Sequence, residues 1–272
     1  MVRPHATLRA LSLGLLFLAL VLLGLAVVAQ DRTTAQRRAG TGVVPGGAAR
    51  TFPQVQSESL PDGHSYRLHT FRVALARARV EVVDLRMSLA LDDVVRTRGA
   101  SLVINGGFFG LQGEPEGMVV SGGRLLSPFL ARIGGGIVEA RGGVAHLLDG
   151  EAPPLEQSAD FALQCRPRLV VDRAVNIRRD DGQRADRTAL CLRDGGRTLD
   201  VVVARTDGEE GLGGPTLYGF ARVLARTGCE QALNLDGGPS TGAAWRDGGQ
   251  VRFLPPRSAV RHAVAIWLND GR

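Results

Sequence analysis

The sequence predicts an α+β fold: a single domain with a curved, mostly antiparallel sheet and few helices, after an N-terminal membrane-spanning or signal segment. Three observations predict this fold. Alternating polar and apolar runs outnumber the helical patterns. Gly-Gly and Asp-Gly pairs separate many of these runs, as hairpin turns do. An uncharged apolar run occupies residues 11–29, ahead of all the other elements. Strands joined mainly by hairpins, with few helices between them, are typical of α+β domains.

The N-terminal run predicts export of the rest of the chain. Arg3 and Arg9 precede residues 11–29, and a positive flank keeps the N-terminus inside. The run is close to the roughly 20 residues that span a bilayer and longer than the roughly 7–15 of a signal core. However, "VVA" just before Gln30 suits a cleavage site. Both a membrane anchor and a cleaved signal therefore stay open, and both predict an extracytoplasmic protein, periplasmic or at the cell surface.

The chain divides into three parts. Residues 1–29 form the anchor or signal, and residues 30–50 carry polar, Gly and Pro residues without periodicity, as a flexible linker does. Residues 51–272 form one domain without internal repeats. Its hydrophobic content fits one sizeable core, because 44% of the 272 residues are hydrophobic. The net charge is +6, but the arginines are scattered and aromatic residues make up 5%, so no nucleic-acid partner is expected.

The first half of the domain predicts three strands, a helix and two hairpins. Residues 65–75 and 78–86 alternate as half-buried strands. Residues 89–99 predict a short helix that ends at Gly99, and a buried strand follows at 101–104. Hairpins are then predicted over 117–126 and over 134–148, because paired glycines interrupt two apolar runs.

The second half repeats this pattern. A hairpin is predicted over 187–205 and another over 243–254, each around an Asp-Gly-Gly turn. Between them, residues 216–228 have apolar positions at helical spacing, with Gly228 as the stop. The strands 231–235 and 263–268 are near-continuously apolar.

Three cysteines indicate one disulfide in an oxidising compartment. Cys165 and Cys191 lie in segments expected to be neighbours, so they are the expected pair, with Cys229 left over. The absence of a CxxC motif argues against a zinc site.

The tripeptide Asp-Gly-Gly occurs three times, and one copy differs. Asp194 and Asp247 each stand between alternating strands, where Asp-Gly suits a tight turn. Asp236 follows a near-continuous apolar strand and precedes Pro239 and two hydroxyl residues. The glycines after Asp236 let a ligand approach the backbone closely. Either a functional carboxylate or a turn or capping aspartate fits this pattern.

Two further segments resemble parts of a site. "SLVINGGFFG" places Asn105 at the end of a buried strand, before two glycines and two phenylalanines, which also fits a glycine loop anchored by core aromatics. Arg187 begins a strand whose next residues are small. It is either a surface cation or a bidentate partner for an anion.

Taken in order, "NGGFF", "RTA" and "NLDGG-x-S" resemble the phosphodiester glycosidase family, over roughly residues 65–270. The segments "GMVVSGGRLL", "RPRLVVD" and "GCEQALNLDGG" are also similar to it. The resemblance implies an extracytoplasmic α+β domain that hydrolyses the bond between a sugar and a phosphodiester. Pro239 stands where many members have a third glycine. Cys165 and Cys191 stand where many have a small residue.

The resemblance also implies roles for individual residues. A carboxylate faces the anomeric carbon in glycoside hydrolysis, and Asp236 is expected to be that carboxylate, as nucleophile, base or electrostatic stabiliser. A cation holds the phosphate where negative charge develops, and Arg187 is expected to do so, with Asn105 completing the catalytic set. The expected substrate-binding residues are Gly106, Gly107, Phe108, Thr188, Asn234, Gly237, Gly238, Ser240 and Thr241. Glu114, Glu116 and His262 are weaker candidates.

The expected substrate is a carbohydrate phosphodiester in an envelope or exopolysaccharide glycan. The chain is also expected to contact the membrane through residues 11–29. Two alternatives stay open: a glycan-binding or assembly module without catalysis, and a phosphoesterase that cleaves the phosphorus–oxygen bond. The latter usually recruits metal ions. His64, His69 and His146 lack metal-ligand spacing, so no metal or cofactor is expected.

Overall fold

The fold is described from a computed structural model that covers residues 54–59, 65–86, 90–153, 159–206 and 213–269. The expected anchor or signal at 1–29 and the linker at 30–50 lie outside the described residues. Within these ranges, no helix has both the length and the apolar character needed to cross a membrane. The strands of this part of the chain form three sheets, in which all pairings are antiparallel.

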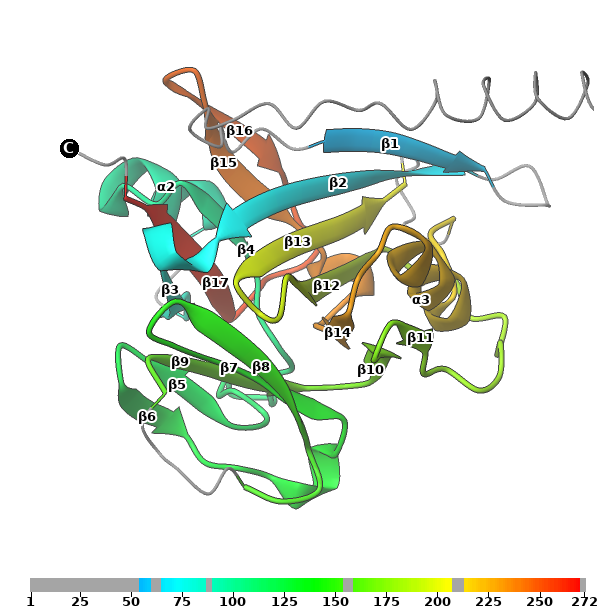
Figure 1. The fold of residues 1–272 in the computed structure, drawn as a ribbon. Coiled ribbons are helices and arrows are strands. Elements are labelled where there is room, and N and C mark those ends of the chain that lie inside the picture. Colours follow the sequence, from blue (N-terminus) through cyan, green and yellow to red (C-terminus); the bar gives the residue numbers. More distant parts are fainter. Residues whose placement is uncertain (1–53, 60–64, 87–89, 154–158, 207–212, 270–272) are drawn as a thin grey trace, which may run out of the picture. The chain divides into compact units, whose positions relative to one another are not determined.

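The first sheet has seven strands in the spatial order β1-β2-β13-β12-β14-β10-β11 (Figure 1). Their bounds are β1 (Gln54–Ser59), β2 (Ser65–Ala74), β13 (Thr198–Arg205), β12 (Arg187–Arg193), β14 (Gln231–Asn234), β10 (Arg168–Val171) and β11 (Ala174–Val175). The second sheet has the order β16-β15-β4-β17-β3. Its strands are β16 (Gln250–Leu254), β15 (Ala243–Asp247), β4 (Leu102–Asn105), β17 (His262–Leu268) and β3 (Ala78–Asp84).

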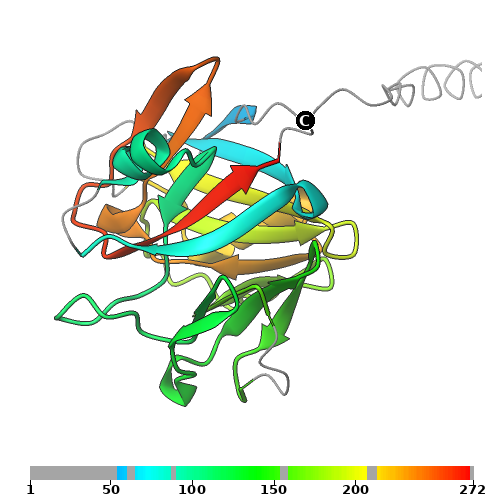
Figure 2. The ribbon, with the colours of Figure 1, turned by 90° about the vertical axis from the view of Figure 1, so that its left-hand side faces the viewer.

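The third sheet has the order β6-β5-β9-β7-β8, and Figure 2 shows it, in green, against the other two. Its strands are β6 (Arg124–Ser127), β5 (Val119–Ser121), β9 (Phe161–Cys165), β7 (Gly136–Arg141) and β8 (Val144–Asp149). The described residues include two α-helices, α2 (Leu91–Arg98) and α3 (Leu217–Arg226). Three short 3-10 helices are η1 (Leu75–Arg77), η2 (Ala131–Ile133) and η3 (Gly238–Ser240).

One central core holds the three sheets together. Side chains from all of them meet in it, including Leu190 of β12, Ile104 of β4 and Leu163 of β9. Because successive side chains of a strand point to opposite faces, the neighbours of these residues lie in other clusters. Ala189 of β12 packs beneath α3, and Val103 of β4 packs beneath α2. The central strands are therefore buried on both faces, which explains their nearly continuous apolar sequences.

Each helix covers the outer face of a sheet. α3 buries Phe220 and Leu224 against the first sheet, and its N-cap Thr216 accepts a hydrogen bond from Gly219 N at 3.0 Å. α2 packs on the second sheet and ends at Gly99, whose φ of 71° is the left-handed cap that glycine favours. Both helices were predicted, and so were the four hairpin turns with paired glycines, which join β5–β6, β7–β8, β12–β13 and β15–β16.

The fold differs from the expectation in its sheet arrangement. The mostly antiparallel, curved β-structure is confirmed, but it is split into three sheets around one core. The strands β1 and β9 to β11 were not predicted. All five side chains of β9 are buried, so "FALQC" lacks the polar and apolar alternation by which a half-buried strand is recognised.

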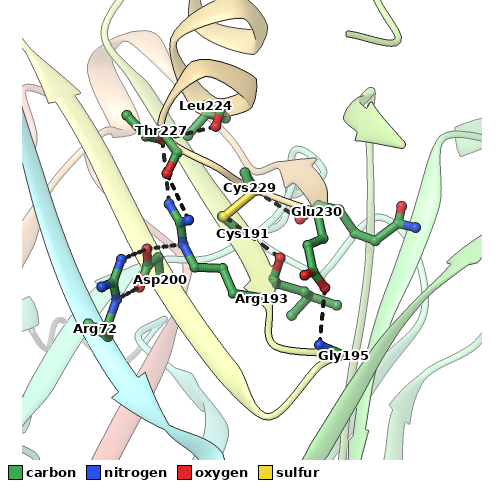
Figure 3. The surroundings of a disulfide bond; sticks show 11 residues. Arg72, Cys191, Arg193, Gly195, Asp200, Leu224, Thr227, Cys229 and Glu230 are labelled. Carbon is green, nitrogen blue, oxygen red and sulfur yellow. Dashed lines mark hydrogen bonds and ion pairs between the residues drawn. A yellow bond between two sulfur atoms is a disulfide. The ribbon is translucent and has the colours of Figure 1, made fainter. Parts of the chain in front are cut away.

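The expected Cys165–Cys191 disulfide is wrong, because Cys191 pairs with Cys229 (Figure 3). Cys191 lies on the α3 side of β12, opposite Ala232 of β14, and Cys229 precedes β14 on the same side. The Cys165 side chain instead belongs to the central core and is a buried free thiol. The two cysteines of the expected pair therefore lie in different core clusters.

Charged side chains surround this disulfide (Figure 3). The fully buried Asp200 accepts hydrogen bonds from Arg72 at 2.8 and 2.9 Å and from Arg193 Nε at 2.5 Å. Arg193 Nη1 also donates to the Thr227 carbonyl at 2.8 Å. This network ties the β12–β13 hairpin to the end of α3.

Candidate functional site

The predicted Asn105 and Asp236 loops meet where the second sheet contacts the first. Asn105 is the last residue of β4, and Asp236 follows β14 by two residues. Asn105 Nδ2 donates to the Asp236 carbonyl at 2.8 Å, and Asp236 N donates to the Gly106 carbonyl at 3.2 Å. The two glycine loops are thus bonded to each other in both directions.

The Asn105 side chain connects further segments to this pair. Its Oδ1 accepts hydrogen bonds from Thr188 Oγ1 at 2.7 Å and from Gly242 N at 3.3 Å. Thr188 lies on β12, beside Arg187, and Gly242 precedes β15. Since Asn105 is fully buried, an amide with both a donor and an acceptor end suits this position. One side chain therefore fixes four strand ends around Asp236.

The Gly106-Gly107 loop rests on His262, the first residue of β17. Gly106 N donates to the His262 carbonyl at 3.0 Å, and Gly107 N donates to its Nε2 at 3.1 Å. Burial lowers the pKa of His262 to about 4, so the ring stays neutral and Nε2 is an acceptor. A Cβ on Gly106 would lie 2.4 Å from His262 Cδ2. This close contact requires glycine at position 106.

The Asp236 carboxylate is half-buried at the centre of this arrangement. Its Oδ1 accepts a hydrogen bond from Gly237 N at 2.9 Å. Burial raises the pKa of Asp236, while hydrogen bonds from the Ser240 side chain and from Gly237 N act in the opposite direction. A partly desolvated carboxylate with a raised pKa is a better base than an ordinary aspartate.

The backbone from Gly238 to Thr241 is held on both sides. Gly238 N donates to the Asp186 carbonyl at 2.7 Å, and Arg257 N donates to the Pro239 carbonyl at 2.7 Å. Arg205 Nη1 donates to the Thr241 carbonyl at 2.6 Å. The loop that follows Asp236 is therefore fixed by residues from three other segments.

A buried carboxylate organises the residues that hold this loop. Asp186 Oδ1 accepts from Thr206 N at 2.9 Å and from Thr206 Oγ1 at 3.0 Å. Its Oδ2 pairs with Arg205 Nε at 3.2 Å and with Arg257 Nη1. We refer to Asp186, Arg205, Thr206 and Arg257 as the Asp186 clasp. Sequence reasoning missed the clasp, and the only local signal was an aspartate directly before "RTA".

Arg187, one of the predicted site residues, lies beside the Asp236 loop. A Cβ on Gly237 would be 3.8 Å from Arg187 Cδ and 3.0 Å from the Asp186 carbonyl oxygen. The guanidinium donates from Nε to the Pro215 carbonyl at 3.2 Å and from Nη2 to the Gln183 carbonyl at 2.9 Å. Burial lowers the pKa of Arg187, but an arginine remains a cation. Its charge is next to the loop, and two of its nitrogens bind backbone carbonyls.

The end of β9 and the residue that follows it, Cys165 and Arg166, were not predicted to belong to the site. Cys165 Sγ would be 3.7 Å from a Cβ on Gly107. Burial raises the pKa of the Cys165 thiol to about 12, and the charge of Asp236 adds to the rise. The guanidinium of Arg166 lies 5.9 Å from the centre of the Phe108 ring. Cys165 and Arg166 therefore adjoin both glycine loops.

The remaining predicted residues divide into two groups. Asn234, Thr188, Ser240 and Thr241 are buried, and Asn234 Nδ2 donates to the Arg166 carbonyl at 3.0 Å. Thr188 and Asn234 therefore hold neighbouring segments in place, whereas the buried Thr241 Oγ1 has no hydrogen-bond partner within the described part of the chain. Glu114 and Glu116 are engaged elsewhere, because Glu114 accepts from Gln112 N at 3.1 Å and Glu116 from Arg132 at 3.3 Å. Within the described ranges, no group of three or more His, Cys, Asp or Glu side chains is placed to hold a metal ion.

Comparisons with known proteins agree with this picture. A family model described as phosphodiester glycosidase matches residues 98–267, more than half of the chain. The fold is similar to the zebrafish N-acetylglucosamine-1-phosphodiester alpha-N-acetylglucosaminidase catalytic domain, described as auto-inhibited by its pro-peptide. That match has a TM-score of 0.63 and 16% identity, and it covers 82% of this chain and 85% of the other.

A hypothetical protein from Synechocystis is also similar in fold, with a TM-score of 0.57 and 15% identity over 79% of this chain and 62% of the other. No curated protein matches the chain significantly. At these identities the structural matches establish the fold alone.

Proposed function

Because the chain belongs to the phosphodiester glycosidase family, we propose that it hydrolyses the glycosidic bond between a sugar and a phosphodiester. One observation carries the proposal: the Asn105 side chain binds the Asp236 carbonyl and Thr188 together, so all three family-like motifs surround one carboxylate. Residues that come from three distant segments and meet around a half-buried carboxylate are typical of a site rather than of a turn.

The proposed reaction needs a water molecule and no redox partner. The bond between the anomeric carbon and the bridging oxygen breaks, and that oxygen leaves with the phosphate. The water oxygen bonds to the anomeric carbon, and the water proton passes to the departing phosphate or to solvent. Asp236 faces the anomeric carbon, as nucleophile, base or stabiliser of the oxocarbenium-like transition state. The positive charge of Arg187 lies beside the loop and stabilises the charge that grows on the phosphate.

We propose an extracytoplasmic location and a glycan of the cell envelope or an exopolysaccharide as the substrate. The apolar run at residues 11–29 behind Arg3 and Arg9 supports export, and the Cys191–Cys229 disulfide supports an oxidising compartment. Alkaline phosphatase fused after residue 50 tests this location, because that reporter folds actively only after export. An inactive fusion, with the same reporter active behind a known signal, contradicts the proposed location.

The bond that breaks is identified with ¹⁸O-labelled water. The full chain is incubated with the methyl phosphodiester of N-acetylglucosamine 1-phosphate, a probe chosen because the zebrafish protein is described as acting on such a diester. Label in the sugar supports glycosidic cleavage, whereas label in the phosphate identifies a phosphoesterase and contradicts the proposal. Saturable binding of a panel of glycosyl phosphodiesters without turnover indicates a binding module. Turnover that persists in chelator supports a reaction carried by the side chains.

A further inference from the structure

Arg166 extends from the segment that adjoins both glycine loops. Its side chain is exposed, and its guanidinium lies 5.9 Å from the centre of the Phe108 ring. Phe108 directly follows the Gly106-Gly107 loop and packs partly against the central core. Arginine over an aromatic face is held by cation–π attraction without losing its hydrogen-bond donors. The ring therefore orients a charged donor group at the edge of the Asp236 site.

The backbone of Arg166 is fixed relative to Asp236. Asn234, two residues before Asp236, donates from Nδ2 to the Arg166 carbonyl at 3.0 Å, and Asn234 N donates to the Pro167 carbonyl at 3.0 Å. The preceding Cys165 is near enough to Asp236 for its thiol pKa to respond to the carboxylate charge. Arg166 thus projects from a backbone position that is bonded to β14, the strand that ends two residues before Asp236.

The two arginines near the site differ in what their guanidinium groups contact. Arg187 donates from Nε and Nη2 to the carbonyls of Pro215 and Gln183, and these are two of the nitrogens that a bidentate phosphate contact would use. Arg166 is exposed, and its guanidinium is held by a ring face, which leaves the edge of the fork directed to solvent or ligand. Arg187 is therefore a half-buried cation whose donors are partly used by backbone carbonyls, whereas Arg166 is an exposed cation.

We propose that Arg166, supported by the Phe108 ring, binds the phosphodiester of the substrate directly, while Arg187, bonded to the Pro215 and Gln183 carbonyls beside the Asp236 loop, contributes charge without contacting the phosphate. This inference rests on the proposed function, because it names the residue that contacts the phosphate in the same site. The guanidinium fork matches two phosphate oxygens. Arg166 is consequently the residue that distinguishes a charged leaving group from an uncharged one.

The test compares two substrates that share a sugar. One is the methyl phosphodiester of N-acetylglucosamine 1-phosphate, and the other is the p-nitrophenyl glycoside, whose leaving group is uncharged before cleavage. Arg166→Gln lowers kcat/KM for the phosphodiester by about 10- to 100-fold, the range expected for hydrogen bonds to a charged group. It leaves kcat/KM for the uncharged glycoside within about twofold. Arg166→Lys keeps the charge but loses the fork, and it recovers only part of the loss.

Arg168→Gln is the matched control, because it removes the same charge two residues away. The Arg168 guanidinium on β10 pairs instead with Asp149 of β8 at 2.6 Å. The Arg168→Gln variant is expected to leave kcat/KM unchanged for both substrates. If Arg166→Gln lowers kcat/KM equally for both substrates, the proposal is overturned. An unchanged kcat/KM for the phosphodiester also overturns it.

A binding measurement separates this inference from the proposed function. Calorimetric titration with N-acetylglucosamine 1-phosphate is carried out on the full chain and on Arg166→Gln. If neither substrate is turned over, the proposed function fails, yet about 10-fold weaker binding in Arg166→Gln still supports the phosphate contact. If the wild-type chain and Arg166→Gln bind this sugar phosphate equally, or neither binds it, the assignment of Arg166 is wrong.

Discussion

The Asn105 side chain donates a hydrogen bond from Nδ2 to the Asp236 carbonyl over 2.8 Å, across 131 positions of the chain. The same amide accepts from Thr188 through Oδ1. The contact joins the end of a strand in the second sheet to a loop that leaves the first. The position of the carboxylate is therefore set by an amide on a different sheet.

Replacing Asn105 with Asp is expected to damage both the fold and the site. The new oxygen faces the carbonyls of Gly106 and Asp236, where an amide donor is needed, so the free energy of unfolding falls by at least about 1–3 kcal/mol. The kcat of the folded fraction falls as well. The exposed Asn176, which donates to the Arg168 carbonyl, is the control, and Asn176→Asp costs less than about 0.5 kcal/mol. Urea unfolding measures the loss of unfolding free energy in each variant, and equal losses contradict the central role of Asn105.

Asp236→Asn is expected to fold normally and to lose about 100- to 10,000-fold in kcat. The amide oxygen still accepts the Gly237 N–H, so the loop keeps its turn, but the variant no longer has a carboxylate. Asp194→Asn is the control, since Asp194 has a φ of 55° in a hairpin turn that asparagine tolerates. Steady-state kinetics on the phosphodiester distinguish them. If both variants match the wild type, Asp236 is an ordinary turn residue.

His262 makes stability depend on pH. Its pKa is about 4 in the folded chain and 6.5 ordinarily, so the unfolded chain takes up a proton first as the pH falls. Stability from this group is complete above pH 6.5 and is lost progressively towards pH 4, by at most about 3 kcal/mol. The His262→Gln variant lacks this pH-dependent loss. The difference in the free energy of unfolding between the wild type and this variant therefore becomes smaller as the pH falls. The exposed His146→Gln is the control. A gap that stays constant with pH contradicts a neutral, buried His262.

The Asp186 clasp is expected to matter for catalysis as well as stability. Asp186→Asn leaves Arg205 and Arg257 without their buried counter-charge, and breaking such a network costs about 3–5 kcal/mol. Because both arginines also bind the loop after Asp236, kcat falls too. Asp200→Asn is the matched control: it removes a fully buried carboxylate that also binds two arginines, but beside the disulfide. A loss of kcat common to both variants indicates general destabilisation instead.

The three cysteines are expected to behave differently. Removal of the Cys191–Cys229 bridge in the double alanine variant lowers the free energy of unfolding by about 4 kcal/mol, as a loop of this length predicts. The kinetic constants stay unchanged, because the bridge lies on the α3 side of β12. Cys165 is buried with a thiol pKa of about 12, so iodoacetamide modifies it only after denaturation. Mass spectrometry of native and denatured protein checks this, and rapid native alkylation contradicts its burial.

Local signals in the sequence predicted the turns and both described helices. The paired glycines at 122–123, 142–143, 195–196 and 248–249 all have positive φ, which few other residues adopt at low cost. The capping positions Thr216 and Gly99 are likewise readable from neighbouring residues. Where the backbone geometry depends on a few neighbouring residues, the local sequence pattern is sufficient to predict it.

Longer-range relationships were not predictable in the same way. The Asp186 clasp joins residues up to 71 positions apart, and nothing near Asp186 indicates its partners. Cys165 and Cys191 both lie in apolar runs, so their different core clusters depend on strand pairing that one sequence does not reveal. Asn105, Arg187 and Asp236 were selected by motif, whereas Arg166 is visible only once Phe108 is placed beside it.

The Asn105–Asp236 contact spans two sheets, each of which is hydrogen-bonded internally and carries its own helix. The two sheets share one central core, so they are expected to unfold together as a single cooperative unit. A substitution that tightens the packing between them is therefore expected to raise the melting temperature of the whole domain and, with it, the highest temperature at which the surroundings of Asp236 stay assembled.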